Sequence, residues 1–269
     1  MTSAGRRIGD VILRLEHISL AFGGVKALTD ISFDVREHEV RAIIGPNGAG
    51  KSSMLNVING VYRPQQGTIT FRGEVRRDMN THEAAMHGIA RTFQNIALFK
   101  GMTVLDNIMT GRNLRMRASF VEQAIWLGRA RREELENRRK VEEIIDFLDL
   151  QAVRKAITGT LPYGLRKRVE VARAMAIEPQ LILLDEPMAG MNLEEKEDMA
   201  RYIHDLSREW GMTIVMIEHD MGVVMDMSDH VMVLNFGEKI AEGLPAEVTA
   251  HPQVRAAYLG DDLGDEVAR

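Results

Sequence analysis

The chain has 269 residues, of which 45% are hydrophobic, and a formal net charge of −5. This is the composition of an ordinary globular protein, and the charge balance gives no indication of nucleic-acid binding. The absence of cysteine excludes disulfides and cysteine-ligated metals and fits a reducing compartment. We expect no signal peptide, because the first twelve residues are polar and basic with no apolar h-region behind them. We expect no transmembrane helix, because no apolar run approaches the ~18 residues that span a bilayer. Work at a membrane would therefore depend on a partner.

The N-terminal part predicts a flexible arm, residues 1–10, followed by antiparallel strands. Leu13 to Phe22 has the pattern of a strand, but its apolar parity changes near Glu16 and His17, which predicts a β-bulge. A second strand is indicated by apolar residues that alternate with polar ones, namely Ile31, Phe33 and Val35.

A phosphate-binding loop follows this antiparallel part. Residues 45–52 lie between a predicted strand, 40–44, and a predicted helix, and they match G-x-x-x-x-G-K-[ST] at every fixed position. Glycines let the backbone adopt positive φ and turn its N–H groups onto an anion. Lys51 would contact the β- and γ-phosphates of a nucleotide, and Ser52 would hold Mg²⁺, which prefers oxygen ligands. The predicted nucleotide-binding residues here are Gly45, Pro46, Asn47, Gly48, Ala49, Gly50, Lys51, Ser52 and Ser53.

The rest of the chain alternates strands and helices. Residues 100–160 have a helical pattern, and strands resume after them, so they are predicted to form an inserted helical subdomain. The expected strands lie at 68–72, 88–94, 180–184, 213–217 and 231–234, and the expected helices at 165–177, 193–210 and 221–228.

These elements predict an α/β fold, with a core of mostly parallel sheet covered by helices on both faces. An antiparallel β subdomain and the helical subdomain accompany this core. The expected division is core with antiparallel part at 11–100, helical subdomain at 101–165, core again at 166–250, and a C-terminal tail at 251–269 with acidic residues at 261–266.

The helical region contains a basic segment. Between Arg112 and Lys140 there are nine basic and four acidic residues. One interpretation is a solvated helix face. The other is a surface near anionic lipid, or near the cytoplasmic loops of a membrane partner.

Two carboxylates and a histidine complete a candidate ATP site. The apolar strand 180–184 ends in Asp185, which is placed to bind Mg²⁺, and Glu186 next to it is placed to polarise an attacking water. His219 follows another apolar strand, at the edge where a histidine could reach a γ-phosphate. Gln94 ends a third predicted strand, 88–94, and like His219 it is a weak signal when taken alone.

Taken together, these motifs resemble the ATP-binding subunit of an ABC transporter over residues 11–260. They occur in the family's order: the aromatic Phe22, Walker A at 45–52, Gln94, a signature-like segment at 161–165, Walker B at 181–185 with Glu186, and His219. Within the family, several stretches resemble subunits of branched-chain amino acid uptake systems. They are 93–95 with Leu98-Phe99, 102–104, 189–192, 218–221 and 258–260.

The resemblance implies a role for each matched residue. Phe22 would stack on adenine, Gln94 would contact Mg²⁺ and the water and connect the site to the membrane subunit, and Glu186 would be the general base. His219 would hold the γ-phosphate, with Asp185 and Ser52 at the metal. Tyr163 and Gly164, in the signature-like segment, would contact the nucleotide of a second ATP-binding subunit across a head-to-tail dimer.

The signature-like segment departs from the family's usual Leu-Ser-Gly-Gly-Gln, because it reads Leu-Pro-Tyr-Gly-Leu at 161–165. Pro162 has neither a hydroxyl nor a backbone N–H, so the usual serine contact to phosphate cannot form. One hypothesis is an asymmetric pair in which this chain completes an altered second site. The alternative is that Gly164 and the following helix N-terminus suffice for an anion.

The resemblance implies a Mg²⁺-dependent ATPase that powers an ABC importer, for branched-chain amino acids or related small carboxylates. The expected partners are transmembrane permease subunits and a second ATP-binding subunit, as a homodimer or a heterodimer. They would hold the chain peripherally at the cytoplasmic face of the cell membrane. Alternatives are an ABC ATPase for another cargo, such as lipid or lipopolysaccharide export, a soluble ABC protein acting on DNA or ribosomes, and a regulatory subunit that binds ATP without cleaving it.

Overall fold

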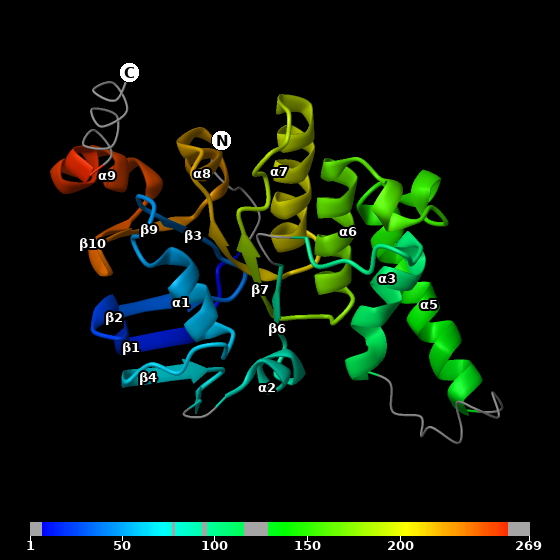
Figure 1. Ribbon diagram of the computed structural model, residues 1–269, viewed down its shortest axis with the longest axis horizontal. Helices are drawn as coiled ribbons and strands as arrows, with labels where there is room; N and C mark the ends of the chain where they lie inside the picture. Colours follow the sequence, from blue (N-terminus) through cyan, green and yellow to red (C-terminus); the bar gives the residue numbers. More distant parts are fainter. Residues whose placement is uncertain (1–6, 77–78, 93–95, 116–128, 258–269) are drawn as a thin grey trace.

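The structure is a computed structural model that describes residues 7–76, 79–92, 96–115 and 129–257 (Figure 1). The described strands form two sheets, one of six strands and one of four. Figure 1 shows them beside each other at one end of the molecule, while a group of helices forms the other end.

The six-stranded sheet is the parallel core that the sequence predicts. Its order is β10-β9-β3-β8-β7-β6, with β10 antiparallel at one edge and the other pairs parallel. Every residue of β3, β7 and β8 is buried, as expected for strands covered on both faces. The bounds are β3 Val40–Ile44, β6 Ile89–Arg91, β7 Leu181–Asp185, β8 Thr213–Ile217, β9 His230–Asn235 and β10 Glu238–Gly243.

The four-stranded sheet is the predicted antiparallel part, with order β2-β1-β4-β5. Its register shifts between Leu15 and Ile18 of β1, and His17 has a φ of 54°, so the predicted bulge near Glu16 and His17 is confirmed. The strands are β1 Val11–Phe22, β2 Val25–Arg36, β4 Gln66–Phe71 and β5 Glu74–Val75.

Alternate residues of the parallel strands face two different apolar cores. Ala42 and Ile44 of β3 join the core that the longer helices cover, whereas Ile43 joins the core shared with α1 and the antiparallel sheet. Helices thus cover both faces, and the predicted fold class is confirmed. The helices are α1 Lys51–Ile58, α2 Thr81–Met86, α3 Val104–Gly111, α5 Arg129–Phe147, α6 Tyr163–Met175, α7 Leu193–Arg208, α8 Met221–Met227 and α9 Pro245–Ala250.

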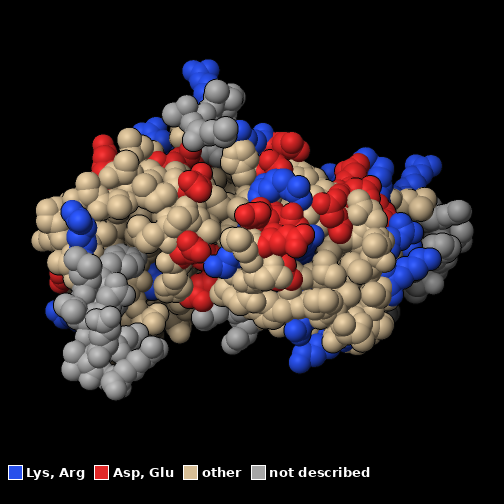
Figure 2. All heavy atoms as spheres, turned by 90° about the horizontal axis from the view of Figure 1, so that it is seen from above, with Lys and Arg blue, Asp and Glu red and all other residues tan. Residues whose placement is uncertain are grey.

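Helices α3, α5 and α6 pack together, with α6 against the parallel sheet and with α3 and α5 on its far side (Figure 1). None of the helices within the described ranges has both the length and the apolarity of a bilayer span. Seen from above, acidic side chains gather over the middle of the molecule and basic ones around the end where α5 lies (Figure 2).

A buried group of charges joins the two sheets. Arg41 on β3 donates from Nε to Glu39 Oε1 at 2.7 Å, from Nη1 to Glu242 Oε1 at 2.5 Å, and from Nη2 to the carbonyl of Asp34 on β2 at 2.7 Å. The Arg41 side chain is 6% exposed and that of Glu39 is 0% exposed. Arg41 therefore compensates a carboxylate that has no access to water.

Arg41→Met is expected to lower the free energy of unfolding by about 3–5 kcal/mol, because it leaves the Glu39 charge buried without its cation. Urea unfolding followed by circular dichroism measures this loss. Arg14→Met is the matched control: Arg14 pairs with Asp34 at the surface, and its loss should leave the unfolding midpoint close to that of the wild type. Equal midpoints for both variants would contradict this assignment.

Candidate active site

The glycines of the loop between β3 and α1 have conformations that other residues disfavour. Gly45 has a φ of 147°, Gly48 of 79° and Gly50 of 101°. A Cβ at Gly45 would lie 2.0 Å from the carbonyl oxygen of Leu234, and one at Gly50 would lie 2.6 Å from that of Ala27. The sharp curl of the loop therefore depends on glycine, at Gly45 and Gly50 through direct backbone contact as well as φ.

Lys51, at the start of α1, hydrogen-bonds to the phosphate-binding loop on its inner side. Its Nζ donates to the carbonyls of Gly45 at 2.7 Å and Pro46 at 2.8 Å, and the residue is only 6% exposed. The ammonium thus lies inside the curl where the loop's N–H groups would meet an anion. Ser52, the next residue, is exposed at the first turn of α1.

Sheet register brings three motifs to one edge. On β3, Ile43 pairs with Ile217 of β8, and Asp185 of β7 pairs with the same Ile217. Three segments therefore lie at the carboxyl ends of neighbouring strands: the phosphate loop, Glu218-His219 and Asp185-Glu186. This is the edge at which parallel α/β sheets bind ligands.

Glu186 and His219 are in direct contact at this edge. His219 Nε2 lies 2.7 Å from Glu186 Oε1, and the two side chains are 43% and 16% exposed. Glu186 has a φ of 50°, and its N–H donates to the carbonyl of Ile217 at 3.1 Å. A carboxylate held by a histidine in this way can orient a water and accept its proton.

Asp185 is buried beside Glu186. Arg91 Nη2 donates to Asp185 Oδ2 at 2.9 Å, and both side chains are 5% exposed. Within the described part of the chain, the other oxygen, Oδ1, is buried and accepts no hydrogen bond. A buried carboxylate oxygen without a donor, near the exposed Ser52 of the same edge, fits a hard cation such as Mg²⁺.

A second buried carboxylate, Glu218, supports the same edge. Its Oε1 accepts from the N–H of Met188 at 3.0 Å and its Oε2 from that of His219 at 3.3 Å. Burial raises the pKa of Glu218, and the two hydrogen bonds oppose this shift only in part. Glu218 belongs to the family-like stretch 218–221, but its residue type and position alone indicate no separate role.

The signature-like segment begins α6. Pro162 is the N-cap, without a side-chain hydrogen bond, and Tyr163 is the first helical residue, 37% exposed. A Cβ at Gly190 would lie 3.4 Å from Tyr163 Cε1, and one at Gly164 would lie 2.3 Å from Glu195 Oε1. The segments 161–165 and 188–192 therefore pack against each other within one chain. The pKa of Tyr163 is raised, chiefly by burial.

Phe22 lies at the end of β1 and is 45% exposed. Its ring packs edge-to-face on Tyr62, with centroids 4.9 Å apart, and the N–H of Tyr62 donates to the carbonyl of Asn56 on α1. Phe22 is thus connected to the helix that follows the phosphate loop. Gln94 lies outside the described residues, so its predicted contacts stay a prediction.

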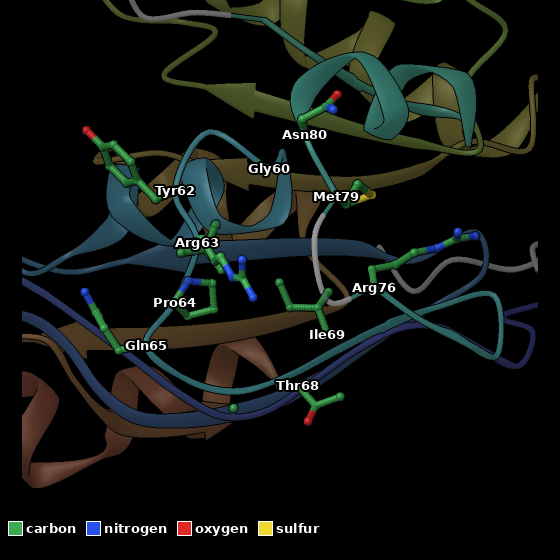
Figure 3. Close-up of a pocket in the computed structure, with 12 residues that line it drawn as sticks. Gly60, Tyr62, Arg63, Pro64, Gln65, Thr68, Ile69, Arg76, Met79 and Asn80 are labelled. Atoms are coloured by element: carbon green, nitrogen blue, oxygen red, sulfur yellow. The ribbon is translucent and has the colours of Figure 1, made fainter.

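Two hollows lie near these residues. One, of about 840 Å³, lies between the end of α1, β4 and the stretch before α2; Arg63 and Pro64 point into it while Tyr62 points away (Figure 3). The described residues that line it include none of the predicted nucleotide-binding residues. The other, of about 690 Å³, adjoins the phosphate loop and has Pro46, Asn47 and Phe236 in its wall. Phe236, 85% exposed, has no motif that would have singled it out.

Comparison with known proteins decides the family. The ABC transporter profile matches residues 28–189. The chain is also 36% identical to the high-affinity branched-chain amino acid transport ATP-binding protein BraF of Pseudomonas aeruginosa, over 93% of this chain and 98% of BraF. The chain belongs to the ABC transporter family. The resemblance inferred from the motifs is thereby confirmed, and membership implies an ATPase coupled to transport.

Further matches agree with this family assignment. A branched-chain amino acid ATP-binding cassette transporter profile matches residues 238–264. The corresponding protein LivG of Escherichia coli is 32% identical over 93% of this chain and 98% of its own. Among solved structures, the ADP conformation of an ATP-binding cassette of an ABC transporter has a TM-score of 0.81 and 34% identity, covering 93% of this chain and 99% of that one.

Proposed function

We propose that this chain is the Mg²⁺-dependent ATPase subunit that powers an ABC importer for branched-chain amino acids or related small carboxylates. The observation that carries the ATPase is the contact of Glu186 with His219 at the edge that also bears Lys51 and Asp185. The cargo is supported by the relatives, BraF and LivG, whose names specify branched-chain amino acid transport.

One group of residues binds the nucleotide and the metal ion. The loop N–H groups and Lys51 bind the phosphates, and Phe22 stacks on the adenine. Ser52, Gln94 and Asp185 would hold Mg²⁺, which supplies charge stabilisation to the transferring phosphoryl group.

A second group of residues, Glu186 and His219, activates the attacking water. Glu186 accepts its proton, and His219 holds Glu186 in place and reaches the γ-phosphate. The contact of 2.7 Å between His219 Nε2 and Glu186 Oε1 supports this division of roles, because it fixes the direction of the carboxylate.

The competent form is a head-to-tail pair of ATP-binding subunits docked on transmembrane permease subunits. Those partners hold the chain at the cytoplasmic face of the membrane. Tyr163 and Gly164 contact the partner's nucleotide from the N-terminus of α6. Pro162 removes the usual serine contact, so this chain either pairs with itself through the helix dipole or forms the altered half of an unequal pair.

The ATPase rate of the purified chain, measured against its concentration with and without Mg²⁺, tests this proposal. A pair predicts a rate that rises faster than linearly and that needs Mg²⁺. Activity that appears only with a second ATP-binding subunit indicates the unequal pair. A rate linear in concentration that persists in Lys51→Ala would contradict the proposal, because it would come from another site or a contaminant.

A further inference from the structure

Arg91 connects three of the elements that build the site. It lies on β6, donates from Nη2 to Asp185 Oδ2 on β7 at 2.9 Å, and donates from Nη1 to Asn56 Oδ1 on α1 at 2.5 Å. Asn56 lies on the same helix as Lys51 and Ser52. One guanidinium therefore bridges the helix of the phosphate loop and the strand of the predicted metal ligand.

The ion pair with Arg91 leaves one carboxylate oxygen of Asp185 available to a metal ion. A carboxylate that is 5% exposed is costly without a cation, and Arg91 supplies one with equally little exposure. The guanidinium uses Oδ2 alone, while Oδ1 is buried and accepts no hydrogen bond within the described ranges. The planar guanidinium of arginine donates from separate nitrogens in a rigid fork, whereas lysine carries its donors on one nitrogen at the end of a flexible stem.

The residue after Arg91 is also bonded to β7. Thr92, beside Arg91, accepts from the N–H of Asp185 through Oγ1 at 3.4 Å and donates its own N–H to the carbonyl of Leu183 at 2.9 Å. The end of β6 is therefore fixed to β7 at the metal ligand itself.

We propose that Arg91 is a positioning residue for the magnesium site: it fixes Asp185 so that Oδ1 is presented to the metal, and Asn56 fixes Arg91 in turn. This inference rests on the proposed function, which makes Asp185 a metal ligand. Groups that hydrogen-bond a metal-ligating carboxylate typically change metal affinity by about 10–100-fold when they are replaced.

Arg91→Lys tests the geometry, because it keeps the positive charge and loses the fork. Mn²⁺ replaces Mg²⁺ as the probe, and its binding to the chain with a non-hydrolysable ATP analogue is followed by electron paramagnetic resonance. We expect Arg91→Lys to weaken Mn²⁺ binding about tenfold, and to leave binding of the analogue in EDTA unchanged. Arg76→Lys is the matched control, since the side chain of Arg76 pairs with Glu74 and His87, which are not part of the predicted site.

The outcomes separate this inference from the function on which it rests. Wild-type Mn²⁺ affinity in Arg91→Lys, with or without a lower melting temperature, overturns the positioning role. Failure of the wild-type chain itself to bind the analogue would instead overturn the proposed function. If Arg91→Lys does not fold, Asn56→Leu, which removes only the anchor of Arg91, must weaken Mn²⁺ binding at least threefold, and wild-type affinity there overturns the inference.

Discussion

Glu186→Gln is expected to lower ATP turnover by about 100-fold to 10,000-fold, the range typical of a lost general base. The amide oxygen can keep the contact with His219 Nε2, and the residue stays the same size at a strained φ of 50°. It cannot accept a proton at neutral pH. We therefore expect ATP affinity close to that of the wild type, measured with a fluorescent analogue, beside a single-turnover rate that is nearly abolished.

Glu209→Gln is the matched control for this substitution. Glu209 is the exposed C-cap of α7 and precedes the N-terminal end of β8, whereas the site lies at the carboxyl ends of the strands, so its replacement should leave turnover unchanged. If Glu186→Gln kept more than a tenth of the wild-type rate, another group would be the base. Equal loss of binding and turnover would mean that Glu186 supports the fold instead.

Gly45→Ala is expected to lower the free energy of unfolding by more than about 3 kcal/mol and to abolish ATP binding, because strained backbone and a steric clash add together. The new Cβ would lie 2.0 Å from the carbonyl oxygen of Leu234, at a φ of 147°. Since that oxygen belongs to β9, which pairs with β3, neither strand can yield without loss of the sheet. Urea unfolding and binding of the fluorescent analogue measure the two effects.

Gly48→Ala separates sterics from conformation. Gly48 also has a positive φ, 79°, but a Cβ there meets nothing within 4 Å. Only the left-handed backbone is penalised, at about 1–2 kcal/mol. Similar losses of stability at Gly45 and Gly48 would show that the contact with Leu234 has little influence on the loop.

The features that could be predicted are those that depend on the spacing of residue types along the chain. Patterns of residue type show the fixed positions of residues 45–52. They also show the apolar strands that end in Asp185 or precede His219. Parallel pairing then places all of these strand ends at one edge. The bulge near His17 was also predictable, because a change in which alternate residues are apolar has few other causes in a strand.

Short elements and distant pairs were not predictable in the same way. Strand β10 has few apolar residues, and β5 has only two residues. Helix α2 was missed although Asn80 and Glu83 form a capping box, a signal that could have located it. The pairing of Arg91 with Asp185 joins residues 94 positions apart, and no local pattern selects one arginine over another.

Uptake of radiolabelled leucine tests the central claim most directly. The gene is deleted in the source organism, and the strain is complemented with the wild-type chain or with Lys51→Ala, which lacks the ammonium held inside the phosphate loop. We predict that the wild-type chain restores uptake and that Lys51→Ala, present at the same level, does not. Leucine uptake that is unchanged by the deletion, or restored equally by both forms, would contradict the assignment of this chain as the ATPase of a branched-chain amino acid importer.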